Sequence, residues 1–294
     1  MPFSRFVSIT EINKGWSGDK KYRAIDAGGN SYLLRVTNSP RGERYPDMFR
    51  MQKKVEALEV SMCNPIECGK CDEGYYMLQR FVDGVDAEEA VKGMSEEEEQ
   101  YRLGYEAGEY LRLIHTIPAP EDQPDWEPRF NAKIDKKIKN YQACPLKYEN
   151  DEFILDYIAK NRHLLKDRPQ CYQHGDYHIG NMMIENGRIV IIDFDRYDFG
   201  DPWEEFNRIV WCAQAAPTFA SGNVDGYFGG KAPRDFWSLL ALYIASNTLS
   251  SLYWAIPFGE KEINTMRNQA REVLDWYDNF TNVIPKWYKG GKNG

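Results

Sequence analysis

Residues 173–181 read "QHGDYHIGN", and the run "IIDFD" follows at residues 191–195. The first stretch gathers two histidines, an aspartate and an asparagine, and the second contains two aspartates. Between them lies Asn186-Gly187, a dipeptide that tolerates the positive φ angles of a type I′ turn. The sequence therefore predicts a β-hairpin whose open end carries polar side chains from both stretches.

The turn also predicts the register of this hairpin. A two-residue turn pairs residue 185 with 188 and, four steps further along, residue 181 with 192. This register returns Asp193 to the neighbourhood of Asn181, on strands roughly 5 Å apart. Because side chains alternate along a strand, the end of the hairpin has to be irregular for both side chains to face one site.

The residue types at this hairpin indicate phosphoryl transfer. Carboxylate and amide oxygens, as in Asp193 and Asn181, suit Mg²⁺, which proteins hold with few groups plus substrate phosphates. Asp176 lies in the loop that leads into the hairpin, where its carboxylate can accept a hydroxyl proton. Since His174, Asp176 and His178 alternate, a zinc site of a metallohydrolase is an alternative interpretation.

The chain divides into a strand-rich part, residues 1–82, and a mainly helical part, residues 83–294, so we expect an α+β fold. Strands are predicted at 6–13, 21–26, 31–37, 64–67 and 75–82, with one helix at 46–60. Residues 83–93 read as a connector. Ser95 and Glu98 form a capping box for the next helix, which runs towards Pro118. Further helices are predicted at 130–142, 151–165, 203–215, 235–256 and 261–278.

Composition narrows the function classes. The 37 basic and 45 acidic residues leave a net charge of −8, which argues against general nucleic-acid binding. An acidic surface can attract a cationic small molecule, or it can serve solubility alone. The N-terminus lacks a signal peptide, and the uncharged segment 236–259 contains polar residues, so we expect a buried helix there and no membrane span. The six cysteines fit a reducing cytoplasm better than a disulfide framework or a zinc site.

The motifs together resemble the aminoglycoside phosphotransferase and choline-kinase-like family. "HGDYHIGN" resembles the catalytic loop H-G-D-x-x-x-x-N, and "IIDFD" with the later "GDPWEE" resembles the metal-binding strand end and the segment after it. The resemblance implies a two-lobed protein-kinase-like fold, with a small antiparallel-sheet lobe and a larger, mainly helical lobe. It implies that Asp176 is the catalytic base, that Asn181 and Asp193 bind Mg²⁺, and that His174 supports the loop. Asp195 would be a further metal ligand or a substrate contact.

The resemblance also implies a nucleotide site in the first eighty residues. In "KGWSGDKK", Gly15, Ser17 and Gly18 would present backbone donors to phosphates. Arg35 stands where the family usually carries a lysine, and its acidic helix partner is left open between Asp47 and Glu56. The residues expected to contact adenine are the backbone near Gln79 and Phe81, with Met77 behind it.

For the acceptor, the family commonly uses small hydroxylated molecules that bear amino groups. The acids after the metal strand, Asp198, Asp201, Glu204 and Glu205, either bind ammonium groups or cap and start a helix. His178 either borders the acceptor pocket or has a structural role.

The sequence thus predicts a cytoplasmic O-phosphotransferase that uses ATP or GTP and Mg²⁺. The predicted acceptor is a small, cationic molecule. The favoured class is an aminoglycoside-type or other antibiotic, which would make the enzyme an antibiotic-resistance kinase. The alternatives are a metabolic kinase for choline, an amino alcohol or a sugar derivative, and an inactive nucleotide-binding regulatory module. We expect a monomer or a weak dimer that binds neither nucleic acid nor a membrane.

Overall fold

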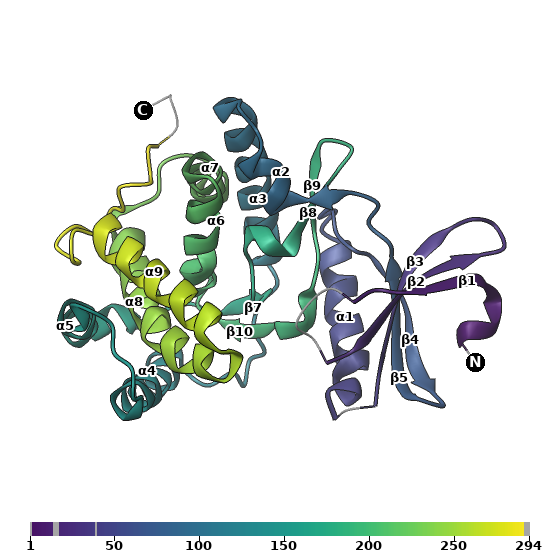
Figure 1. The fold of residues 1–294 in the computed structure, drawn as a ribbon, viewed down its shortest axis with the longest axis horizontal. Coiled ribbons are helices and arrows are strands. Elements are labelled where there is room, and N and C mark those ends of the chain that lie inside the picture. The colour runs from purple at the N-terminus through teal and green to yellow at the C-terminus, as the bar shows by residue number, and fades with distance from the viewer. Residues whose placement is uncertain (1, 14–17, 39, 291–294) are drawn as a thin grey trace. The chain divides into compact units, whose positions relative to one another are not determined.

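The computed structural model describes residues 2–13, 18–38 and 40–290, which form two compact units (Figure 1). The first unit comprises Met1–Ala87 and Asn181–Tyr197, and the second comprises Glu88–Gly180 and Asp198–Gly294. The sequence predicts one boundary, between residues 82 and 83. In the structure the first unit also takes in the central hairpin, because a strand at Val85–Asp86 pairs with it.

The first unit contains a five-stranded antiparallel sheet with the order β1-β2-β3-β5-β4. Its strands are β1 Phe6–Glu11, β2 Lys20–Asp26, β3 Ser31–Thr37, β4 Pro65–Cys71 and β5 Gly74–Arg80. Helix α1, Tyr45–Glu56, packs against β4 and β5. The predicted strands and helix are confirmed, with ends that shift by a few residues.

Both faces of β3 are covered, and this places Arg35 in the interior. One face of the sheet carries a core formed by Ala24, Leu34, Val36 and Leu78. The other face carries Met77, which packs against Tyr45 and Met48 at the start of α1. Arg35 is the cross-strand neighbour of Met77, so it lies on the α1 side of the sheet and is 2% exposed.

The hairpin has the predicted turn and register. Strands β6 Val85–Asp86, β8 Met182–Glu185 and β9 Arg188–Ile191 form a second sheet in the order β6-β8-β9. Asn186 and Gly187 have φ angles of 54° and 73°, as the type I′ turn requires. Glu185 pairs with Arg188, and the ladder continues to Met182 and Ile191.

The second unit is mainly helical (Figure 1). Its α-helices are α2 Ala87–Lys92, which begins at the boundary, α3 Glu97–Ile114, α4 Trp126–Ala143, α5 Asp151–Asn161, α6 Ile209–Ala215, α7 Pro217–Phe228, α8 Arg234–Ala255 and α9 Glu260–Trp276. Strands β7 Cys171–Gln173 and β10 Asp198–Gly200 form an antiparallel pair. The described 3₁₀ helices of the chain are η1 Pro2–Arg5, η2 Pro40–Arg44, η3 Arg162–Leu165, η4 Ile179–Asn181, η5 Phe194–Arg196, η6 Glu204–Arg208 and η7 Ile256–Phe258.

Helices α3 and α7 pack closely because glycines line their contact. A Cβ atom built on Gly108 of α3 would lie 2.1 Å from the carbonyl oxygen of Asn223 in α7. A Cβ atom on Gly226 of α7 would lie 2.0 Å from the carbonyl oxygen of Tyr105. Only glycine permits backbones to approach this closely without displacing one of the helices.

Two predictions about the helical part are wrong, and one helix was not predicted. The predicted capping box fails because Glu96 is the N-cap of α3 and makes no side-chain cap bond. The connector at 83–93 contains β6 and α2. Helix α7 is not predicted at all, because every residue from Phe219 to Tyr227 is buried and the segment shows no amphipathic stripe.

One helix in the described part of the chain, Arg234–Phe258, is long and apolar enough to cross a membrane. Its most apolar window has a mean hydropathy of 1.3, and 67% of that window is buried inside the fold. The segment is a core helix of the second unit, as predicted from its polar residues.

Candidate active site

The open end of the hairpin brings Asn181 and Asp193 together within the first unit. The backbone N–H of Ile192 donates to the carbonyl of Asn181 at 3.1 Å, which adds the predicted 181–192 pair to the ladder. Regular geometry stops there, because Asn181 lies in η4 and Asp193 has a left-handed backbone with φ 65°. The irregular end that the sequence predicts is therefore present.

The guanidinium of Arg35 joins three carboxylates of the first unit. Its Nη2 lies 2.7 Å from Oδ2 of Asp19, its Nη1 lies 3.5 Å from Oδ1 of Asp193, and both nitrogens bond to the carboxylate of Asp195. The side chains of Asp19 and Asp195 are 1% and 8% exposed, whereas that of Asp193 is 36% exposed. Asp193 is thus the most accessible of the three acids to a ligand.

Asp19 and Asp195 are the buried acidic partners of Arg35, and both predicted partners are wrong. Asp47 and Glu56 each pair with a basic residue of α1 itself. The buried face of α1 instead presents Tyr45, whose hydroxyl donates to Oδ2 of Asp19 at 2.9 Å. The acids are therefore supplied by the residue directly before β2 and by Asp195 of η5, and not by the helix.

Charge and burial act against each other in this group. Burial opposes the charge of Arg35, but Asp195 and Asp193 outweigh burial and raise the pKa of Arg35 above its ordinary value. Burial also raises the pKa of Asp195, an effect that Arg35 reduces and Asp193 reinforces. The arginine stays charged and offsets much of the negative charge at the end of the hairpin.

The predicted phosphate-covering loop is only partly described. Gly15 and Ser17 lie outside the described residues. Gly18 is exposed, and no atom lies within 4 Å of a Cβ built on it. The next residue, Asp19, is buried and pairs with Arg35, and this ion pair anchors the described end of the loop.

The predicted adenine-contacting residues all lie on or just after β5. Met77 is fully buried. The side-chain amide of Gln79 donates to Oε1 of Gln52 at 2.9 Å, and the backbone N–H of Phe81 donates to the carbonyl of Ser31 at 3.3 Å. Contact of these residues with a nucleotide base stays a prediction.

The loop before the hairpin belongs to the second unit, where Glu205 of η6 holds it. The carboxylate of Glu205 accepts the backbone N–H of Gly175 at 2.9 Å and that of Tyr177 at 3.4 Å. His174 is fully buried, and its Nδ1 accepts the backbone N–H of Asp176 at 3.3 Å. Hydrogen bonds therefore fix the backbone on both sides of Asp176.

Asp176 lies beside two groups that can carry positive charge. Nε of Arg208 lies 3.3 Å from its Oδ1, and Nε2 of His178 lies 3.8 Å away. Burial lowers the pKa of His178 to about 4, although Asp176 opposes the shift, so this histidine is neutral at pH 7. Arg208 therefore places a positive charge beside Asp176 within this unit.

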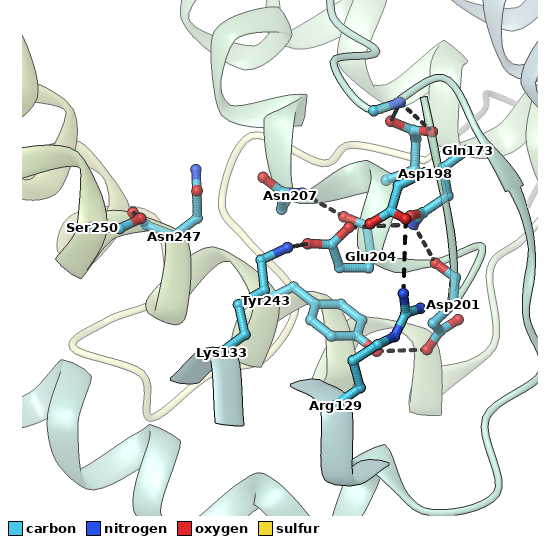
Figure 2. A network of polar contacts seen from close by, with 12 residues as sticks. Arg129, Lys133, Gln173, Asp198, Asp201, Glu204, Asn207, Tyr243, Asn247 and Ser250 are labelled. Atoms are coloured by element: carbon cyan, nitrogen blue, oxygen red, sulfur yellow. Dashed lines mark hydrogen bonds and ion pairs between the residues drawn. The ribbon is translucent and has the colours of Figure 1, made fainter. Parts of the chain in front are cut away.

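The four acids after the hairpin already have partners in the second unit, and Figure 2 shows Asp198, Asp201 and Glu204 among them. The carboxylate contacts are Asp198 to Arg129 at 3.7 Å, Asp201 to Arg168 at 2.6 Å, Glu204 to Lys133 at 3.5 Å, and Glu205 to the loop described above. Asp201 also accepts the hydroxyl of Tyr243 at 2.6 Å and the backbone N–H of Trp203 at 3.0 Å. These contacts favour the structural interpretation of the acids over ammonium binding.

The motifs in the sequence did not point to Asp19, Arg208 or the lysines of α4 as residues of the site. Asp19 follows the glycine-rich stretch, but nothing in the order of residues says that it pairs with residue 35. Arg208 and Lys137 lie in segments predicted to be helical, and only the fold brings them near Asp176 and Glu204. Within the described residues, no group of three or more His, Cys, Asp or Glu side chains is arranged to hold a metal ion.

Comparison with known proteins identifies the chain. The model of the phosphotransferase enzyme family matches residues 8–237. The chain belongs to this family. It is a small-molecule kinase, and the resemblance noted in its motifs is confirmed. No curated protein sequence matches it.

Solved structures of family members share its fold. A choline/ethanolamine kinase family protein from Mesorhizobium loti is 14% identical, with a TM-score of 0.70 over 95% of this chain and 92% of its own. A thermostable mutant of aminoglycoside phosphotransferase APH(4)-Ia, bound to ADP and hygromycin B, is 17% identical, with a TM-score of 0.67 over 93% of this chain and 95% of its own. The GDP complex of aminoglycoside 2′-phosphotransferase-IIIa is 16% identical, with a TM-score of 0.68 over 92% and 94%. The predicted protein-kinase-like fold is confirmed.

Proposed function

We propose that the enzyme transfers the terminal phosphoryl group of ATP or GTP to a hydroxyl of a small molecule. The hydroxyl oxygen attacks the terminal phosphorus and forms the new P–O bond, and the bond to the β-phosphate oxygen breaks. Asp176 orients the hydroxyl and accepts its proton late, because an aspartate is too weak a base to ionise an alcohol outright. The nucleoside diphosphate leaves with the electron pair of the broken bond.

The observation that supports this proposal is the end of the hairpin. The Ile192–Asn181 hydrogen bond brings the backbone of Asn181 close to that of Asp193, which has a left-handed conformation and an accessible carboxylate. Asn181 follows Asp176 by five residues in the chain, which is the spacing of the family's catalytic loop.

These oxygens fit Mg²⁺. Asn181 and Asp193 offer hard oxygen ligands, and Mg²⁺ takes its remaining ligands from phosphates and water. When bound, the metal neutralises charge on the phosphates. Asp195 and Asp19 are buried against Arg35, whereas Asp193 is 36% exposed, so Asp193 is the acid that we assign to the metal. We further propose that the backbone of the Gly18 loop covers the phosphates and that the strand around Gln79 and Phe81 contacts the base.

We propose that the acceptor is a metabolite rather than an antibiotic, which makes the enzyme a metabolic kinase. The relatives include both an antibiotic-bound kinase and a choline/ethanolamine kinase family protein. The acids predicted to bind an amino-bearing antibiotic have protein partners instead. All six cysteines are free, which supports the proposal of a cytoplasmic enzyme.

The test replaces Asp176 with Asn, a change that keeps shape and removes the proton acceptor. Transfer should fall by about 10²–10⁴-fold, measured as phosphorylated product, while nucleotide affinity stays unchanged. Asp122→Asn, at an exposed loop position, is the matched control and should keep full activity. Normal turnover by the Asp176 variant would show that Asp176 is not the proton acceptor. Nucleotide binding without transfer by the native protein, over a broad acceptor panel, would favour the regulatory module.

The metal assignment is tested separately with Asp193→Ala. Mg²⁺ with a non-hydrolysable nucleotide should raise the melting temperature of the native protein and not that of the variant. A full magnesium-dependent shift in the variant would contradict the assignment.

A further inference from the structure

The 3₁₀ helix η6 holds the loop of Asp176 at two points. The carboxylate of Glu205 accepts the backbone N–H groups of Gly175 and Tyr177. Three residues further along the same helix, Nε of Arg208 lies 3.3 Å from Oδ1 of Asp176. One short segment therefore fixes the backbone of the loop through an acid and contacts its functional side chain through a base.

Arg208 makes few polar contacts apart from this one. In the described part of the chain it forms no hydrogen bond, and Asp176 is its ion-pair partner. Arg168, by comparison, bonds to both carboxylate oxygens of Asp201 and lies 3.9 Å from the centroid of the Trp203 ring. The side chains of Arg208 and Asp176 are 29% and 16% exposed, and a partly exposed ion pair contributes little to stability. A structural role alone therefore does not explain the contact.

Charged and titratable groups lie on several sides of the loop of Asp176. They include His174, His178, Glu88 of α2, and Glu205 and Arg208 of η6. Neither histidine is charged at pH 7, because burial lowers the pKa of His178 to about 4 and Nδ1 of His174 accepts a backbone N–H, as a neutral ring does. Among these groups Arg208 supplies the positive charge, against the acids and Asp176 itself.

We propose that Arg208 is a positioning residue of the transfer reaction, which orients the Asp176 carboxylate towards the acceptor hydroxyl and keeps it ionised. The proposal rests on the proposed function, because Asp176 is taken as the group that receives the hydroxyl proton. As the new P–O bond forms, the O–H bond breaks and its proton moves to the carboxylate of Asp176. The charge of Arg208 disfavours the protonated carboxyl, so the proton then passes to water and Asp176 is restored for the next turnover.

The first experiment measures turnover of the full chain with water as the acceptor. Hydrolysis of MgATP is followed as release of inorganic phosphate. Arg208→Met should lower kcat about 10- to 100-fold and leave the KM for ATP unchanged, because a misplacement of about 1 Å can cost about 10²-fold in rate. Arg208→Lys, which keeps the charge, should lose less. Arg112→Met, at an exposed position of α3, is the matched control and should hydrolyse MgATP at the native rate.

A double variant tests whether Arg208 acts through Asp176. In the Asp176→Asn chain, adding Arg208→Met should change kcat by less than about twofold, because the group that Arg208 positions is already absent. If the two losses multiply instead, Arg208 acts independently of Asp176 and the proposal is wrong.

The second experiment measures the ionisation of Asp176 without nucleotide or acceptor. In a chain labelled with ¹³C at the aspartate carboxyl groups, the NMR signal of Asp176 is the one that Asp176→Asn removes. The midpoint of its pH titration should rise by about one pH unit or more in Arg208→Met, because the neighbouring cation that favours the charged carboxylate is lost. Arg208→Lys should keep the midpoint near its native value.

The two experiments distinguish failure of this proposal from failure of the proposed function. Native turnover by Asp176→Asn, or no phosphate release by the native chain, would contradict the proposed function, and the carboxyl titration would still decide whether Arg208 controls Asp176. If Asp176→Asn loses activity but Arg208→Met keeps the native kcat or the native titration midpoint, the role of Arg208 is overturned and the kinase assignment stands.

Discussion

Replacing Arg35 with Met tests whether the buried ion group holds the first unit together. Methionine fills much of the same volume but leaves Asp19 and Asp195, whose side chains are 1% and 8% exposed, without their cation. Asp19 keeps one hydrogen bond, from the hydroxyl of Tyr45. Removing one partner of a buried ion pair typically costs about 3–5 kcal/mol of unfolding free energy.

The cost of protonating a buried aspartate leads to a similar loss of unfolding free energy. The variant can relieve its uncompensated charge by protonating one aspartate. At pH 7 this costs about 4 kcal/mol, because pH 7 is about three units above the ordinary aspartate pKa and each unit corresponds to about 1.4 kcal/mol. The expected loss is therefore about 3–5 kcal/mol at pH 7.

The same reasoning predicts how the loss depends on pH. Burial already raises the pKa of Asp195, and Arg35 opposes that shift, so removing Arg35 raises the folded-state pKa further. The folded variant then binds more protons than the unfolded chain above pH 4, so its stability falls as pH rises through this window. On lowering the pH from 7 to 5, the gap between variant and wild type should narrow by up to about 1.4 kcal/mol per unit.

The assay is urea unfolding followed by circular dichroism at pH 7 and pH 5. Arg50→Met is the matched control, because Arg50 pairs with Asp47 at the surface, with side chains 69% and 61% exposed. That variant should lose less than about 1 kcal/mol at either pH. A loss for Arg35→Met as small as that of the control, or a gap that does not change with pH, would refute this account of the ion group.

Two further predictions concern the second unit. Glu205→Gln should lose about 1.5–3 kcal/mol of stability and most transfer activity, because the amide removes the negative charge and the second acceptor oxygen, Oε2, which lies 3.2 Å from the backbone N–H of Gly175. Glu121→Gln, at an exposed position, is the control, and equal stability and turnover of the two variants would contradict the role of Glu205. Gly108→Ala should cost about 1–3 kcal/mol or more, measured by urea unfolding, because its Cβ would meet the backbone of α7 at 2.1 Å. Gly93→Ala, whose Cβ would meet nothing closer than 3.6 Å, should be nearly neutral, and equal losses at both glycines would argue against the close contact of α3 and α7.

The sequence by itself determined the central hairpin. Asn186-Gly187 favours positive φ at both turn positions, and the length of the turn then sets every pair up to Asn181 and Ile192. These are interactions between residues close in the chain, so their chemistry can be read from the order of residues. The alternation of β3 likewise predicts its strand, and the motifs around Asp176 indicate the family.

Only the tertiary structure decided which charges meet. Arg35 pairs with Asp19 and not with an acid of α1. The carboxylate of Glu205 binds the backbone of the loop that carries Asp176. Of the acids expected to bind an ammonium group, Asp198, Asp201 and Glu204 contact protein cations, and Glu205 accepts backbone N–H groups. The physical reason is that an ion pair depends on distance and burial, and both are set by packing between segments that lie far apart in the sequence.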